Sequence, residues 1–129
     1  MMLMSLAGAD VVITPDELES ALRDRYEHLH VARSPSGRGN AVNIGILAGA
    51  FQPILDLSDS MANLAIQGSW EEAAEIAAVV RAALPADGPA LVLLDDDGSG
   101  FADVPVGSTP ESVASGWRDI SHFPGYSED

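Results

Sequence analysis

The chain has 129 residues, and 20 acidic residues against 6 basic ones give it a formal charge of −14 at pH 7. Hydrophobic residues make up 47% of it, and it has no cysteine. This composition indicates one globular domain and excludes an acidic disordered chain, a disulfide framework, a thiolate metal site and a cysteine nucleophile. The negative charge also disfavours direct binding to nucleic acid.

The N-terminal segment 1–10 has neither the basic residues nor the long apolar run of a secretory signal. No apolar stretch is long enough to cross a bilayer, so we expect a cytoplasmic protein with no membrane role. We expect a single domain over 1–129, with irregular ends at 1–10 and 121–129. All of the basic residues are arginine, and together with the abundant Ala, Gly, Asp and Val this is typical of a bacterial protein.

Three predicted helices begin at a capping residue that is followed by proline or an acidic residue. The caps are Thr14, Ser69 and Thr109. Glu17 and Glu72 stand three residues after the first two caps and complete a capping box. The second helix is rich in alanine and ends before Pro85, and the third is short and ends near Gly116. We expect the two main helices to pack on one face of a sheet.

Six runs have the alternation or the short apolar character of strands. They cover 28–34, 41–48, 54–57, 62–67, 90–94 and 101–106. The first two are expected to form a hairpin, as are the next two, although 56–66 could instead be a short helix. The continuous apolar run 90–94 predicts a central strand covered on both faces. The pattern predicts an α+β fold with a mainly antiparallel sheet, and a ferredoxin-like elaboration if residues 1–13 contain a strand.

Oxygen-bearing side chains after the run 90–94 resemble a calcium loop in their spacing. Asp95, Asp97, Ser99 and Asp103 match ligand positions of such a loop, but Val106 stands where a bidentate glutamate is needed. A hairpin turn in which the short polar side chains bond to the backbone explains the same residues. We therefore treat calcium as a weak candidate.

Two histidines supply a weaker candidate for zinc. His28 and His30 lie two apart on a predicted strand and so project to one face, and His122 could be a third ligand. A polar strand face explains the same pattern without a metal. We expect no cofactor and no bound metal.

No motif in the chain predicts catalysis. Gly98-Ser99-Gly100 lacks the spacing of a nucleophile elbow, and the loop 34–40 matches neither phosphate-binding fingerprint. We therefore expect a protein that is not an enzyme.

Acidic residues gather at the start of the second helix and after the run 90–94. If these clusters share a face, they suit a basic protein partner, with an exposed aromatic residue as an anchor. The predicted contact residues are Glu71, Glu72, Glu75, Asp95, Asp96, Asp97 and Tyr126. Trp117 is expected to pack in the core under the last helix.

The leading expectation is a small acidic binding protein that occludes a basic protein, in the manner of immunity proteins, antitoxins and nucleic-acid mimics. Size and charge carry this expectation, and no motif does. One alternative is a homo-oligomeric assembly or phage structural module with an apolar interface. A calcium- or zinc-binding sensor is a second, and an acidic surface that only maintains solubility explains the same charge.

Overall fold

The computed structural model describes residues 2–6, 13–33, 40–58, 63–85, 91–95, 100–119 and 121. The described part contains both strands and helices in an α+β arrangement, as expected. In chain order the elements are β1 (Met2–Leu6), α1 (Pro15–Arg25), β2 (Leu29–Arg33), β3 (Asn40–Ile46), β4 (Ile54–Ser58), β5 (Asn63–Gln67), α2 (Trp70–Ala83), β6 (Leu91–Asp95), β7 (Gly100–Val104), α3 (Pro110–Ser115) and β8 (Arg118–Asp119).

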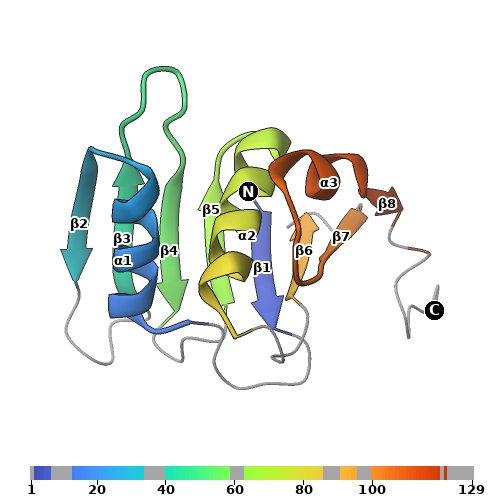
Figure 1. The fold of residues 1–129 in the computed structure, drawn as a ribbon, viewed down its shortest axis with the longest axis horizontal. Coiled ribbons are helices and arrows are strands. Elements are labelled where there is room, and N and C mark those ends of the chain that lie inside the picture. Colours follow the sequence, from blue (N-terminus) through green and yellow to red (C-terminus); the bar gives the residue numbers. More distant parts are fainter. Residues whose placement is uncertain are drawn as a thin grey trace.

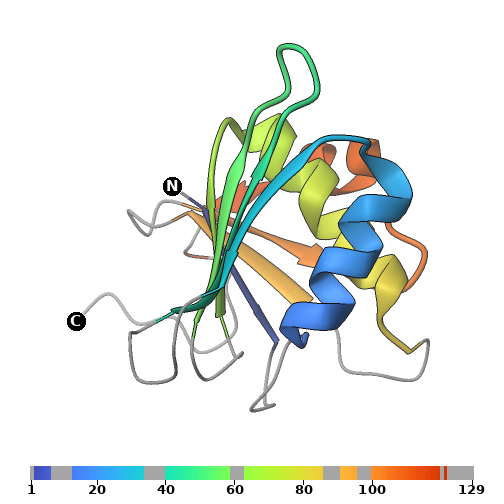
Figure 2. The ribbon, with the colours of Figure 1, turned by 90° about the vertical axis from the view of Figure 1, so that its left-hand side faces the viewer.

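The strands form one eight-stranded sheet in the order β2-β3-β4-β5-β1-β6-β7-β8, and all neighbours are antiparallel (Figure 1). The connections β1–α1–β2 and β5–α2–β6 both return to the sheet through a helix, as in a ferredoxin-like fold. The strands β3 and β4 extend that pattern by one hairpin, and β7, α3 and β8 extend it at the other edge. All three described helices lie on the same side of the sheet (Figure 2).

The strand β1 corrects the expectation that residues 1–10 are irregular. Its Met2 pairs with Ile66 of β5 and with Asp95 of β6, so the N-terminal strand occupies the middle of the sheet. The segment MLMSL has neither the strict alternation nor the β-branched residues that indicate a strand. Only the pairing with distant strands identifies this segment.

The predicted capping residues begin all three helices. Thr14 Oγ1 accepts a hydrogen bond from Glu17 N at 3.2 Å, and Glu17 Oε1 accepts one from Thr14 N at 3.2 Å. Ser69 and Glu72 make the same reciprocal pair at 3.2 and 2.8 Å. These bonds satisfy N–H groups that would otherwise have no partner at a helix start, which is why the sequence fixes these boundaries.

The core lies between the helices and one face of the sheet. Leu18 and Leu22 of α1 are fully buried, and so are alternating residues of the neighbouring strands. In β3 and β4 these are Val42, Ile44, Leu55 and Leu57. The buried alanines of α2 leave little bulk between helix and sheet, so that α2 packs closely over the centre.

The strand β6 lies inside the sheet, as predicted. The prediction that both of its faces are covered differs from the structure, because the described helices cover only one of them. Leu91 and Leu93 are fully buried, whereas Val92 and Leu94 are only half-buried. The described helices all cover the same side, so alternate residues of this apolar run face the opposite side of the sheet. The hairpins predicted for β2–β3 and for β4–β5 are confirmed.

Candidate partner-binding surface

The fold brings two predicted acidic clusters to one end of the sheet. Met2 pairs with Asp95 at the end of β6 and with Ile66 of β5, and β5 leads directly into α2. The first turn of α2 and the end of β6 therefore lie at the same end, the upper one in Figure 1. Only the backbone of Asp95 is described there. Three other predicted contact residues lie outside the described residues: Asp96, Asp97 and Tyr126.

Glu72 is held by backbone groups of its own chain. Its carboxylate accepts hydrogen bonds from Ser69 N at 2.8 Å and from Gln52 N at 3.1 Å. The bond from Ser69, followed by that from Gln52, lowers the pKa of this carboxyl against the opposing effect of burial. Glu72 thus ties the start of α2 to the loop between β3 and β4.

Glu75 is also engaged inside the molecule. Tyr26 Oη donates a hydrogen bond to Glu75 Oε2 at 2.5 Å, and the Arg25 guanidinium lies 3.5 Å from Glu75 Oε1. The Tyr26 ring stacks on Phe51 with 5.4 Å between ring centroids. Burial, and after it the hydrogen bond to Glu75, raises the pKa of Tyr26, so the hydroxyl remains a donor at neutral pH. This network joins α1, α2 and the loop after β3.

Every arginine that the structure describes makes a contact inside the molecule. The ion pairs are Arg23–Glu19, Arg25–Glu75, Arg33–Asp16, Arg33–Glu19 and Arg118–Asp103. Arg81 is 2% exposed and donates to the carbonyl of Pro85 at 3.2 Å, while its Nε has no acceptor among the residues that the structure describes. Exposed pairs add little stability, but each one offsets a positive charge at short range. The described surface therefore presents little uncompensated positive charge.

Other exposed carboxylates have no hydrogen bond or ion pair with any residue that the structure describes. They are Asp24, Glu27, Glu71 and Glu111. Asp24 lies at the end of α1 and Glu27 just after it. Glu71 lies in the first turn of α2, and Glu111 in the first turn of α3. Trp70 Nε1 donates to Ala114 O at 2.9 Å, which joins the start of α2 to α3. Of the three predicted α2 contacts, Glu71 alone thus has a carboxylate that no described residue engages.

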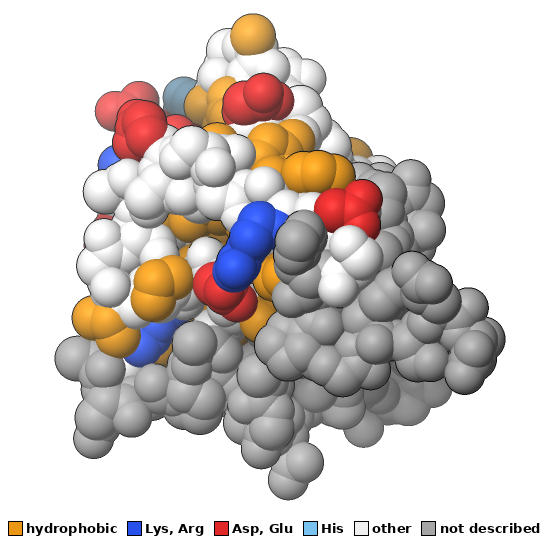
Figure 3. Space-filling model, turned by 90° about the vertical axis from the view of Figure 1, so that its right-hand side faces the viewer, with side chains coloured by type: hydrophobic (Ala, Val, Ile, Leu, Met, Phe, Trp, Pro, Cys, Tyr) orange, Lys and Arg blue, Asp and Glu red, His pale blue; other side chains and the backbone are white. Residues whose placement is uncertain are grey.

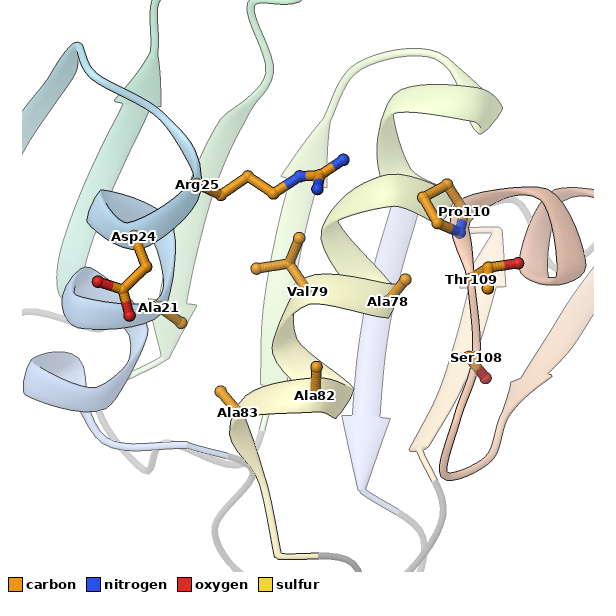
Figure 4. A pocket seen from close by; sticks show the side chains of 10 residues that line it. All are labelled: Ala21, Asp24, Arg25, Ala78, Val79, Ala82, Ala83, Ser108, Thr109 and Pro110. Atoms are coloured by element: carbon orange, nitrogen blue, oxygen red, sulfur yellow. The ribbon is translucent and has the colours of Figure 1, made fainter.

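A trough with a volume of ≈ 570 Å³ runs along the outer side of α2 (Figure 4). One wall is α1, with Asp24 and Arg25, and the other is the segment 108–110. The floor is made of small apolar side chains: Ala78, Val79, Ala82 and Ala83. This trough combines an apolar floor with a carboxylate at its α1 wall that no described residue engages.

Trp117 corrects the expectation that it packs in the core, because it is 42% exposed. The helix α3 ends at Gly116, so the tryptophan follows the helix and is not covered by it. Its indole lies against Gly100, where a Cβ atom would overlap the ring. Gly100 is the first residue of β7, and its lack of a side chain leaves the space that the indole occupies.

The structure reaches only part of the two metal candidates. Asp97, Ser99 and His122 lie outside the described residues. Asp103 pairs with Arg118. His28 and His30 are exposed. Within the described ranges, no three His, Asp or Glu side chains gather as a metal site requires.

Comparison with known protein families, curated proteins and solved structures finds no match for the chain. None of the described helices has the length and apolar character needed to cross a membrane.

Proposed function

We propose that this chain is a small, non-enzymatic, cytoplasmic binding protein that occludes a basic protein partner, as immunity proteins, antitoxins and nucleic-acid mimics do. The observation that carries the proposal is the use of charge. The described arginines are bound internally, while exposed carboxylates at or near the ends of three helices have no partner among the described residues. With a formal charge of −14, such a surface attracts cationic proteins and repels phosphate backbones.

Steering and affinity come from different parts of this surface. The carboxylates of Asp24, Glu27, Glu71 and Glu111 accelerate the encounter with a basic protein. The trough beside α2 supplies apolar area that a partner side chain or helix can cover. Since buried apolar groups supply most of the affinity of protein interfaces, the trough is the proposed centre of the contact.

The test is capture by the immobilised protein from a lysate of its own source organism at about 0.15 M salt, where weak surface attraction is largely screened. The control is a variant with Asp24→Asn, Glu27→Gln, Glu71→Gln and Glu111→Gln, whose fold is checked by circular dichroism. One basic protein that is retained stoichiometrically by the native chain and lost by the variant supports the proposal.

Retention of only abundant cationic proteins that wash off with salt contradicts it, as does equal retention by the variant. Light scattering on the purified chain distinguishes the assembly alternative. A stable closed oligomer whose interface covers the trough assigns that surface to self-association instead of to a basic partner.

A further inference from the structure

A second hollow lies at the edge of the sheet next to β8. The strand β8 pairs only with Gly100 and Phe101, so the rest of β7, which pairs with β6 on its other side, has no strand along this outer edge among the described residues. A pocket of ≈ 410 Å³ lies there, lined by Asp103, Pro105 and Trp117 together with α3 residues. Figure 3 views this edge, where hydrophobic side chains lie beside acidic and arginine side chains. Its exposed aromatic wall distinguishes this pocket from the trough.

The aromatic wall is held in place by the strand beside it. Gly100 is buried, and the indole of Trp117 lies so close to it that no other residue type fits without a shift. Half-exposed tryptophans are frequent anchors of protein interfaces, because they bury a large area with few torsions to fix. Trp117 is thus a positioned surface aromatic residue.

The polar wall of the pocket presents hydrogen-bond acceptors. Ser108 Oγ donates to Pro105 O at 2.6 Å, Ser112 Oγ donates to Thr109 O at 3.0 Å, and Ser115 Oγ donates to Ser112 O at 3.4 Å. Each hydroxyl hydrogen is therefore directed to a backbone carbonyl. Because Ser112 Oγ also accepts from Thr109 N at 2.9 Å, the lone pairs left for a ligand are mainly those of Ser108 and Ser115. An acceptor-rich pocket favours a ligand that brings its own donors.

The charged side chains of the pocket agree with this preference. The Asp103 carboxylate accepts from Arg118, and the Arg118 guanidinium lies 5.0 Å from the Phe101 ring centroid. The single cationic wall residue is thus engaged by a carboxylate and an aromatic ring. Because the pair is half-exposed to solvent, Asp103 can share its oxygens with a second cation at little cost.

We propose that this pocket receives an arginine side chain of the basic partner, stacked on Trp117 and bonded to Asp103 and the serine oxygens. This inference rests on the proposed function and names the recognition site within it. A guanidinium fits better than an ammonium, because it is planar, stacks on indole rings and has five donors for several acceptors. Ser108 also lines the trough, so a partner that covers α2 reaches the pocket without a break in the interface.

The test follows the two indole N–H signals of the ¹⁵N-labelled full chain by NMR during titration with acetyl-Gly-Arg-Gly-amide. Trp117→Phe assigns the signals, and Trp70 serves as the internal reference because its Nε1 is bonded to Ala114 O. We expect a saturable shift of the Trp117 signal. The same peptide with citrulline, which lacks the charge, leaves it unmoved, and the lysine peptide binds about threefold more weakly.

Two variants connect the binding to the pocket walls. With binding followed by the backbone amide signals of Gly116 and Arg118, Trp117→Ala weakens the arginine peptide about fivefold, and Asp103→Asn weakens it about threefold. The matched control Asp16→Asn removes an exposed carboxylate of α1 that also pairs with an arginine, and it leaves the dissociation constant within about twofold. An unchanged spectrum of backbone amides shows that each variant remains folded.

Equal shifts with the arginine and citrulline peptides, or a constant affinity in Asp103→Asn, overturn the inference. Equal affinity for the lysine peptide overturns the assignment to a guanidinium. If the peptide fails to bind while the native chain still captures one basic partner, the pocket is wrong and the proposed function stands. If the pocket binds arginine and no basic partner is captured, the proposed function fails by itself.

Discussion

Polar side chains have opposite roles in two regions of the molecule, the loop between β3 and β4 and the β7–β8 edge of the sheet. At the β3–β4 end, Glu72 and Glu75 are bonded to Gln52, Ser69 and Tyr26, and these bonds join a loop to two helices. At the β7–β8 edge the charged groups are exposed around a pocket, and a tryptophan stands beside them. The first region uses carboxylates to fix the fold, and the second keeps them accessible.

This difference shows why an acidic cluster in a sequence is a poor guide to a contact site by itself. Glu71, Glu72 and Glu75 are neighbours in one helix, yet two of them satisfy internal donors and only the first is unengaged by the described residues. Their roles depend on whether a donor from another element comes within reach. The following predictions test how separate the two regions are.

The largest loss of stability is expected from a substitution in the core beneath the first region. Leu22 is fully buried where α1 packs on the sheet, and Leu22→Ala leaves a cavity there. We expect the free energy of unfolding to fall by about 2–5 kcal/mol in urea denaturation. Trp117→Ala is the matched change in the second region, and we expect it to alter the same quantity by less than about 1 kcal/mol. Equal losses would mean that the two regions contribute equally to the stability of the fold.

Tyr26→Phe removes one bond of the first region and keeps the ring on Phe51. The hydroxyl donates to a carboxylate, so its loss leaves Glu75 with Arg25 as its remaining partner. We expect a loss of about 1–2 kcal/mol of unfolding free energy, measured by thermal or urea denaturation. A loss no greater than that of an exposed tyrosine would show that the network is not structural.

Glu72→Gln tests the same region through pH. The folded pKa of Glu72 is lowered, so the ionised carboxylate stabilises the fold above its unfolded pKa, and this contribution disappears as the pH falls through the folded value. Native stability should therefore decrease on acidification from the ordinary glutamate range downward, and the Gln variant should show a shallower decrease. Urea denaturation from neutral to acidic pH measures both slopes. Parallel curves would contradict the assignment.

The smallest effect on stability is expected at Gly100. A Cβ there overlaps the indole of Trp117, but the ring is half-exposed and can move away. We expect Gly100→Ala to change the unfolding free energy by less than about 1 kcal/mol. The same variant should weaken the arginine peptide about as much as Trp117→Ala does. Unchanged peptide affinity would show that the indole position is irrelevant to binding.

The sequence predicts the elements that local chemistry determines. The capping boxes at Thr14 and Ser69 begin helices as expected, and the alternation of Val42, Ile44 and Ile46 correctly identifies the buried face of β3. Features that depend on distant partners were missed. The strand β1 is defined by its two neighbours in the sheet, and the short β8 by two residues of β7.

The candidate site is predicted less completely than the fold. Glu71 is placed correctly on an exposed turn, but the donors that engage Glu72 and Glu75 come from loops and helices far away in the sequence. Trp117 was assigned to the core because large apolar side chains are usually buried. Its exposure follows from the end of α3 at Gly116 and from the lack of space at Gly100, which only the assembled sheet reveals.

The central place of β1 has a consequence for how the chain is made. The strand β1 is synthesised before both of its neighbours, β5 and β6, so its two edges stay unpaired until those segments have been made. Contacts between such distant segments form slowly, because long loops must close first. The nascent chain therefore carries an unpaired strand until β6 is available, and a chaperone that shields β1 during this time would increase the yield of folded protein.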